Sequence, residues 1–126
     1  MVAVDTNVLV RLVVRDDENQ TRSAERFIEN GCWASIVAFV EAIWVLKSIY
    51  RFDQLQIVAA INMLINNEKL AVEHGEEVSL ALDLFRARPS LAFADCLMLE
   101  LARKAGHLPL GTFDRDLARA DGATRL

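Results

Sequence analysis

The sequence predicts an α/β fold in which helices cover both faces of a short, mostly parallel sheet of four to five strands. Three observations predict this fold. Short β-prone apolar runs alternate along the chain with longer segments of helical apolar spacing. Hydrophobic residues make up 53% of the 126 residues, enough for a real core. The two prolines and five glycines form no linker, so we expect a single domain over residues 1–126.

In the first half of the chain, polar residues mark where strands stop and helices begin. A buried strand is expected to stop at Asp5, and the helix after it to be capped by Thr6 or Asn7. Gly31 closes the next helical segment, and Ser35 caps the strongly apolar helix that follows the second strand. The expected elements are a strand over residues 2–4, helices over 7–14 and 21–30, a strand over 32–34 and a helix over 36–50.

In the second half, the same signals divide the chain into shorter elements. Asp53 caps a helix, and Pro89-Ser90 separates two further helices. Gly106 stops the second of these, and Pro109 indicates a strand that starts there or lies at an edge. The expected elements are a helix after Asp53 with apolar positions between residues 55 and 65, a strand over 70–72, helices over 76–88 and 91–105, a strand over 108–110, a short helix over 114–120 and a fifth strand in the terminal residues.

Nothing in the sequence predicts a membrane span or a signal peptide. Asp5, Asn7 and Arg11 interrupt the apolar N-terminal run well short of the roughly 20 apolar residues that a span requires. A basic segment and a cleavage site of small residues are also missing. Cys32 and Cys96 have apolar neighbours, so we expect buried free thiols in a reducing compartment. A cytoplasmic location is therefore expected.

The net charge of −4 argues mildly against binding to nucleic acid, because proteins that bind nucleic acid are usually basic. However, a cluster of uncompensated acids would lower this count by itself, and a bound divalent cation would invert the local charge. The net charge therefore does not decide whether the protein binds nucleic acid.

Four carboxylates stand out by their context. Asp5 and Asp114 follow predicted strands, and the carboxyl ends of the strands are where such sheets bind ligands. Glu41 and Asp95 are each the only charge in an apolar stretch of a predicted helix. A lone carboxylate in apolar surroundings is costly unless it is paired or bound to a metal. A salt bridge, a helix cap or exposure could explain any one of them, but a shared divalent cation would explain all four.

The ligand type indicates the metal. Carboxylate oxygens and water suit Mg²⁺ or Mn²⁺, whereas zinc prefers histidine and cysteine, and His74 and His107 show no spacing typical of ligands. Magnesium held by acids usually acts on phosphate esters, because it neutralises charge on the phosphoryl oxygens and lowers the pKa of bound water. Whether one metal or two are bound stays open.

At these positions the sequence resembles the PIN-domain nucleases. Order, spacing and chain length agree over essentially the whole chain, and more narrowly the chain resembles the VapC toxins of bacterial and archaeal VapBC toxin–antitoxin pairs. The four motifs that carry the resemblance are Asp5-Thr6-Asn7-Val8-Leu9 after the first strand, Ser35 with Glu41, Phe93-Ala94-Asp95, and Thr112-Phe113-Asp114.

The resemblance implies a PIN-like three-layer α/β/α sandwich and Mg²⁺-dependent endonucleolytic cleavage of RNA, often structured RNA such as tRNA, with Mn²⁺ as a substitute. By the same resemblance, Asp5, Glu41, Asp95 and Asp114 are the metal-site and catalytic acids. It also implies a homodimer and a cognate VapB-like antitoxin whose tail fills the active-site groove.

Neighbouring polar residues have supporting roles under this interpretation. Thr6, Asn7 and Thr112 would hydrogen-bond to the carboxylates or to metal-bound water, and their alternative role is ordinary helix capping. Asp116 is the second choice for the fourth acid, and it takes that role if Asp114 is only a helix cap.

RNA contacts are expected from arginines, which suit phosphate, although solvated surface charge is the alternative for each. Trp33 and Trp44 could stack on bases, but their apolar neighbours predict a place in the core. The apolar helices around residues 37–46 and 57–65 are expected to leave hydrophobic surface for a dimer or an antitoxin. The arginines considered are Arg11, Arg15, Arg86, Arg88 and Arg115.

Two rival classes fit the sequence less well. A Mg²⁺-dependent phosphatase with a nucleophilic aspartate needs a second acid two residues on, where Asn7 stands. A receiver domain needs adjacent acids after an early strand, but Asp16 and Asp17 follow no strand. A non-catalytic metal- or RNA-binding module of the same fold should have lost at least one of the four acids, and none is missing.

Overall fold

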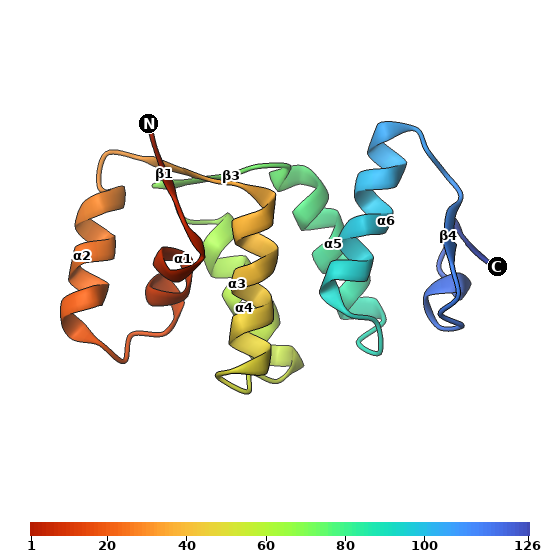
Figure 1. The fold of residues 1–126 in the computed structure, drawn as a ribbon, viewed down its shortest axis with the longest axis horizontal. Coiled ribbons are helices and arrows are strands. Elements are labelled where there is room, and N and C mark those ends of the chain that lie inside the picture. The colour runs from red at the N-terminus through yellow and green to blue at the C-terminus, as the bar shows by residue number, and fades with distance from the viewer. The chain divides into compact units, whose positions relative to one another are not determined.

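The computed structural model describes all residues from 1 to 126, in two compact units. The first unit, Met1–Gly75, runs from red to green in Figure 1, and the second unit, Glu76–Leu126, continues to blue. Each unit has its own helices and its own parallel sheet. None of the helices has the length and apolar content that crossing a membrane requires.

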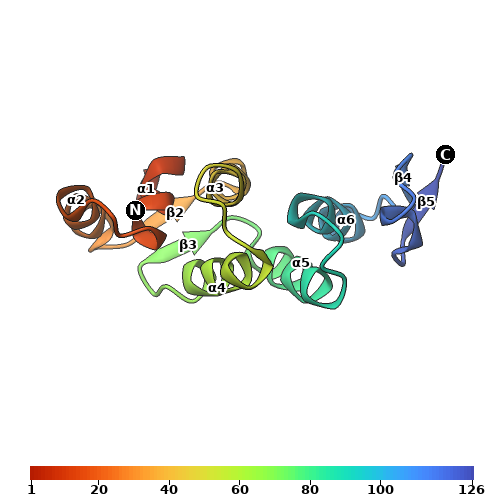
Figure 2. The same ribbon diagram turned by 90° about the horizontal axis from the view of Figure 1, so that it is seen from below.

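The first unit contains a parallel sheet in the order β1-β2-β3. The last residues of the three strands, Val4, Ala34 and Val72, are partners in register. Both views place α1 between α2 and α3 (Figures 1 and 2). The elements are β1 (Val2–Val4), α1 (Thr6–Val13), α2 (Glu18–Ile28), β2 (Cys32–Ala34), α3 (Ile36–Ser48), α4 (Gln54–Ile65) and β3 (Leu70–Val72).

The first helix begins one residue earlier than the sequence predicted. Asp5 is the N-cap, in extended conformation, and its Oδ1 accepts a hydrogen bond from the backbone N–H of Val8. The expectation that Thr6 or Asn7 caps the helix is therefore wrong, because both already belong to the first helical turn. The N–H groups of the first helical turn have no partner within the helix, and an aspartate side chain accepts hydrogen bonds from them as readily as asparagine does.

The caps expected for α3 and α4 are confirmed. Ser35 Oγ accepts from the backbone N–H of Ala38 at 3.1 Å. Asp53 and Gln56 form a reciprocal capping box, in which each side chain accepts from the other residue's backbone N–H. Such caps typically contribute about 1 kcal/mol each and fix where the helix starts.

The core of the first unit is built from one face of each helix. The helix α1 packs against α2, α3 and α4, and α4 also packs against β3. Large side chains that are fully buried each contribute about 1.5–3 kcal/mol relative to exposure. In this unit they include Leu9, Val10, Phe39, Leu46, Ile61 and Leu64.

The second unit is a helix pair followed by a small sheet. The rings of Phe85 and Phe93 pack edge to face with centroids 6.0 Å apart. Gly106 ends the second helix in the left-handed conformation, as the sequence predicted. The elements are α5 (Gly75–Ala87), α6 (Phe93–Ala105), β4 (Leu110–Thr112), the 3₁₀ helix η1 (Leu117–Arg119) and β5 (Ala123–Arg125).

The α/β class and the five short parallel strands agree with the sequence prediction. The strands form a three-stranded and a two-stranded sheet, whereas the prediction placed them in one. The backbone N–H of Leu110 donates to Gly122, and that of Leu126 donates to Thr112, so β4 is paired within its own unit. The expected helix over 114–120 shrinks to the single turn of η1.

Two predictions about side-chain burial have opposite outcomes. Cys32 and Cys96 are buried free thiols, as predicted, and burial together with nearby Asp95 raises the pKa of Cys96 to about 11. The expectation that Trp33 and Trp44 lie in the core is wrong, because 39% and 61% of their surfaces are exposed. An amphipathic or apolar helix can bury only one face against the core, and α3 buries the face that carries Phe39.

Candidate metal-binding acids

In the first unit, the carboxyl ends of the three paired strands bring polar side chains to one edge of the sheet. Asp5, Ser35 and Glu73 each follow the last residue of a strand, and those last residues are in register. This is the edge at which α/β sheets bind ligands. The sequence prediction of Asp5 and Ser35 at this edge agrees with the structure.

Asp5 is exposed and uses one oxygen as the cap of α1. Its Oδ1 accepts from the Val8 N–H at 3.2 Å. A carboxylate has about four lone-pair directions, so this single bond leaves acceptor capacity for a cation. The helix cap and a metal ligand are therefore compatible roles for the same side chain.

Glu41 is tied to the start of α1 by a hydrogen bond. The Oγ1 of Thr6 donates to Oε2 of Glu41 at 3.2 Å. Thr6 immediately follows Asp5, and its hydrogen bond to the Glu41 carboxylate agrees with the supporting role predicted for it. Glu41 lies on the exposed face of α3, so burial among apolar side chains, which the sequence argument assumed, does not apply to it.

Glu73 was missed by the sequence reasoning. Its backbone N–H donates to Ala34 at 2.9 Å, and its Oε1 accepts from the backbone N–H of Ile36 at 2.9 Å. The carboxylate thus satisfies an orphan N–H at the start of α3, where the helix dipole favours negative charge. An acid directly after the predicted strand over residues 70–72 was the available signal, and it is the same signal that singled out Asp5.

In the second unit, Asp95 lies in the first turn of α6 and is half-buried. Burial raises the pKa of Asp95, and the negative charge of Asp114 raises it further. No side chain caps this helix, whose N-cap is Ala92. The charge of Asp114 thus disfavours the ionised form of Asp95, and a bound cation would favour that form.

Asp114 holds the loop after β4 in place. Its Oδ1 accepts from the backbone N–H groups of Asp116 at 2.8 Å and Leu117 at 3.1 Å. Its own backbone N–H donates to Thr112 Oγ1 at 3.0 Å, so Thr112 supports this acid through the backbone. As with Asp5, a capping role occupies one oxygen of an exposed carboxylate.

Asp116 is instead committed to Arg88. Nη2 of Arg88 donates to Oδ1 of Asp116 at 2.6 Å and to its carbonyl oxygen at 2.9 Å. A hydrogen bond from Ser90 and the contact with Arg88 lower the pKa of Asp116. Asp116 thus has a cationic partner inside the unit, whereas Asp114 forms no ion pair.

The arginines expected to contact RNA differ in their surroundings. Arg11 bonds to Asp16 and to the hydroxyl of Tyr50, and its guanidinium lies 5.8 Å from the ring centroid. Arg15 pairs with Glu25, and Arg88 is held as described above. Three of the five arginines therefore serve ion pairs within the protein. The two that remain exposed without an ion pair are Arg86 and Arg115.

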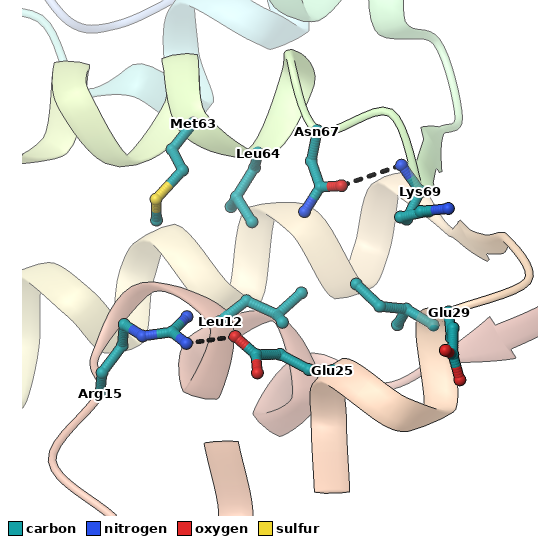
Figure 3. Close-up of a pocket in the computed structure, with 9 residues that line it drawn as sticks. Leu12, Arg15, Glu25, Glu29, Met63, Leu64, Asn67 and Lys69 are labelled. Atoms are coloured by element: carbon teal, nitrogen blue, oxygen red, sulfur yellow. Dashed lines mark hydrogen bonds and ion pairs between the residues drawn. The ribbon is translucent and has the colours of Figure 1, made fainter. Parts of the chain in front are cut away.

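A pocket of about 310 Å³ opens where α1, α2 and α4 meet, and none of these acids lines it (Figure 3). Arg15 and Glu25 point toward each other across it, and Asn67 accepts a hydrogen bond from the backbone N–H of Lys69 at 2.9 Å. Leu12, Met63 and Leu64 supply its apolar lining. Because its main polar groups satisfy one another, this pocket is not a candidate site.

No three acidic, histidine or cysteine side chains converge on one metal position in the structure. It shows a hydrogen bond to Glu41 from Thr6, the residue after Asp5, and an effect of the Asp114 charge on the pKa of Asp95. His74 and His107 are exposed. The chain is thus an α/β protein with acidic side chains directly after β1 and β3, at the edge where sheets of this class bind ligands.

Residues 2–123 match the profile of the PIN domain, and the chain therefore belongs to the PIN domain family. Curated protein sequences give no match. Among solved structures, the chain is similar to the crystal structure of Mycobacterium tuberculosis VapC20, described as a Sarcin-Ricin loop cleaving toxin. The identity is 19%, the TM-score is 0.43, and the match covers 97% of this chain and 96% of that chain. The family assignment rests on the profile match.

Proposed function

We propose that the protein is a Mg²⁺-dependent endoribonuclease and that residues 1–126 are a single PIN domain. The observation that carries this proposal is the family match over residues 2–123, which spans both units. PIN domains are in general nucleases that use divalent metals. The acids at the ends of the strands supply the kind of ligands that this chemistry needs.

The four acids that we propose as metal ligands are Asp5, Glu41, Asp95 and Asp114, each assigned by the motif in which it stands. All four donor groups are carboxylates, which suits Mg²⁺, with Mn²⁺ as a substitute. A bound divalent cation would supply charge neutralisation at the phosphate and a water of lowered pKa. The repulsion between Asp95 and Asp114 is the feature in this chain that a cation would relieve.

We assign the fourth acid to Asp114 rather than Asp116. Asp114 raises the pKa of Asp95 by its charge, so it lies within electrostatic reach of another proposed ligand. Asp116 forms an ion pair with Arg88, and binding a metal there would first require that pair to break. Asp116 is therefore given a structural role.

We further propose that the protein is the toxin of a VapBC-type pair and acts in the cytoplasm as a homodimer. The support is the resemblance of its motifs, above all Asp5-Thr6-Asn7 after the first strand, to those of VapC toxins. A VapB-like antitoxin would be its partner and structured RNA, such as tRNA, its substrate. Exposed apolar side chains on α3 and α4, among them Trp44 and Leu55, offer surface for such partners.

The test is cleavage of a labelled structured RNA in Mg²⁺ and in EDTA, by the wild type and by Asp5→Asn. Asparagine caps a helix as well as aspartate does, so the variant keeps the start of α1 and loses only the charge. Asp17→Asn is the matched control, because Asp17 caps α2 in the same way. Metal-dependent cleavage that Asp5→Asn abolishes and Asp17→Asn retains would support the proposal. Equal behaviour of the three proteins would contradict it.

A further inference from the structure

A second hollow in the first unit lies between α1 and α2, beside the proposed metal site. This groove has a volume of about 670 Å³, within the range of about 300–1,000 Å³ typical of small-molecule sites. Both views of the fold place the two helices next to each other (Figures 1 and 2). Asn7 lines the groove and stands two residues after Asp5, so one end of the groove adjoins that acid.

The lining is rich in side-chain amides. Asn7, Asn19 and Gln20 lie on the groove, and all three are exposed. Their side-chain amides make no hydrogen bonds within the protein, in contrast to the paired polar groups of the pocket in Figure 3. Each amide offers both donors and an acceptor, the combination that reads the edges of nucleobases.

An aromatic ring completes the groove. Phe27 lines it from α2, and 51% of its surface is exposed. Exposed aromatic side chains beside polar groups are the typical platform for stacking an unpaired base of RNA. Val8 and Ala24 add small apolar surface between the two helices.

The charges favour a base over a phosphate in this groove. Arg11 is its one cation, and its guanidinium is already bonded to Asp16 and to Tyr50. A phosphate would need a free cation, whereas a neutral base needs a ring to stack on and amides to bond to. A helix of a protein partner would favour a continuous apolar lining, and here amides interrupt it.

We propose that the groove between α1 and α2 binds one unpaired base of the RNA next to the phosphate that is cleaved. The base stacks on Phe27, and the amides of Asn19 and Gln20 bond to its edge. This inference rests on the proposed ribonuclease function and names the form of its substrate, which is RNA with an unstacked base at the cleavage site.

The experiment measures binding without cleavage, so that it is independent of catalysis. A fluorescein-labelled RNA hairpin with an unpaired loop is titrated in EDTA with the wild type, Phe27→Ala and Phe27→Trp, followed by anisotropy. Loss of one stacked base costs about 1–3 kcal/mol, so Phe27→Ala should weaken binding by about 5- to 150-fold. Phe27→Trp should bind as the wild type does. Leu80→Ala is the control and should bind normally, because Leu80 on α5 is also apolar and has 52% of its surface exposed.

A second RNA with abasic sites in the loop identifies the group that is bound. The wild type should bind it about as weakly as Phe27→Ala binds the intact loop, and Phe27→Ala should lose nothing further. Equal affinity of the wild type and Phe27→Ala for the intact loop would overturn the inference. So would a loss of self-association in Phe27→Ala with unchanged RNA binding, which would assign the groove to a second copy. If binding depends on the base but the protein cleaves no RNA, the base-binding role of the groove stands and only the proposed ribonuclease activity is refuted.

Discussion

The hydroxyl of Thr6 donates a hydrogen bond to Oε2 of Glu41 at 3.2 Å, across 35 positions of the sequence. It joins the first residue of α1 to the middle of α3. Because Thr6 directly follows Asp5, this bond sets Glu41 relative to the end of the first strand. The bond thus holds the Glu41 carboxylate at the start of α1, one residue from Asp5.

Replacing Thr6 with valine keeps the shape of the side chain and removes the donor. We expect kcat for RNA cleavage to fall roughly tenfold, since a hydrogen bond to a charged group contributes about 1.5–3 kcal/mol when fully effective. Single-turnover cleavage across a Mg²⁺ titration measures this. Thr6→Ser retains the hydroxyl and should behave as the wild type. If Thr6→Val cleaves RNA as fast as the wild type at every Mg²⁺ concentration, Thr6 does not position Glu41 for catalysis.

Asp95 should destabilise the metal-free protein at neutral pH. Burial and the charge of Asp114 raise its pKa above the unfolded value, so the folded state binds its proton more tightly. The stabilising contribution is therefore present at low pH and is lost as the pH rises through the raised pKa. In EDTA at pH 7, Asp95→Asn should melt at a higher temperature than the wild type. Added Mg²⁺ should reduce this difference in melting temperature, because it stabilises mainly the wild type. A lower melting temperature for Asp95→Asn in EDTA would contradict this account.

The stabilising contribution of the Arg88–Asp116 pair should depend on pH in the opposite way to that of Asp95. The pKa of Asp116 is lowered in the folded protein, so its contribution is present above the unfolded pKa of about 3.9 and is lost as the pH falls through the lower folded value. In Asp116→Asn the free energy of unfolding should therefore fall less between about pH 5 and pH 2 than it does in the wild type. Urea unfolding across this range, with Asp121→Asn as the exposed control, measures the difference.

Glu73 should stabilise the folded protein through its acceptor oxygen rather than through its charge. Glu73→Gln keeps an oxygen for the N–H of Ile36, and Glu73→Ala leaves that N–H without its partner. We expect Glu73→Ala to lose about 1 kcal/mol and Glu73→Gln to lose little, which thermal unfolding would show as a difference of about 3–6 °C. Equal losses in the two variants would instead assign the effect to charge.

The sequence predicted the elements because their signals are local. Asp53 and Ser35 cap helices through residues three positions away, and Gly106 ends α6 by its own backbone conformation. The candidate acids at Asp5 and Asp114 were found by the same local rule, a polar residue that follows a strand.

Contacts between distant segments were not predictable in the same way. The sequence offered Arg88 as an RNA contact, but its partner Asp116 lies 28 positions away and becomes visible only in the fold. Glu73 reaches Ile36 across 37 positions for the same reason. Trp44 is exposed because α3 is apolar on more than one face, so periodicity does not reveal which face turns inward.

The central claim is that Asp5, Glu41, Asp95 and Asp114 support metal-dependent RNA cleavage and that Asp116 does not. The most direct measurement is single-turnover cleavage of one labelled structured RNA in saturating Mg²⁺ by the five single variants Asp→Asn or Glu→Gln. Loss of a residue that merely supports a metal ligand costs about 10–100-fold, so the four proposed ligands should each lose more than about 100-fold. Asp116→Asn should stay within about tenfold of the wild type. Retained activity in the four variants, or loss confined to Asp116→Asn, would contradict the assignment.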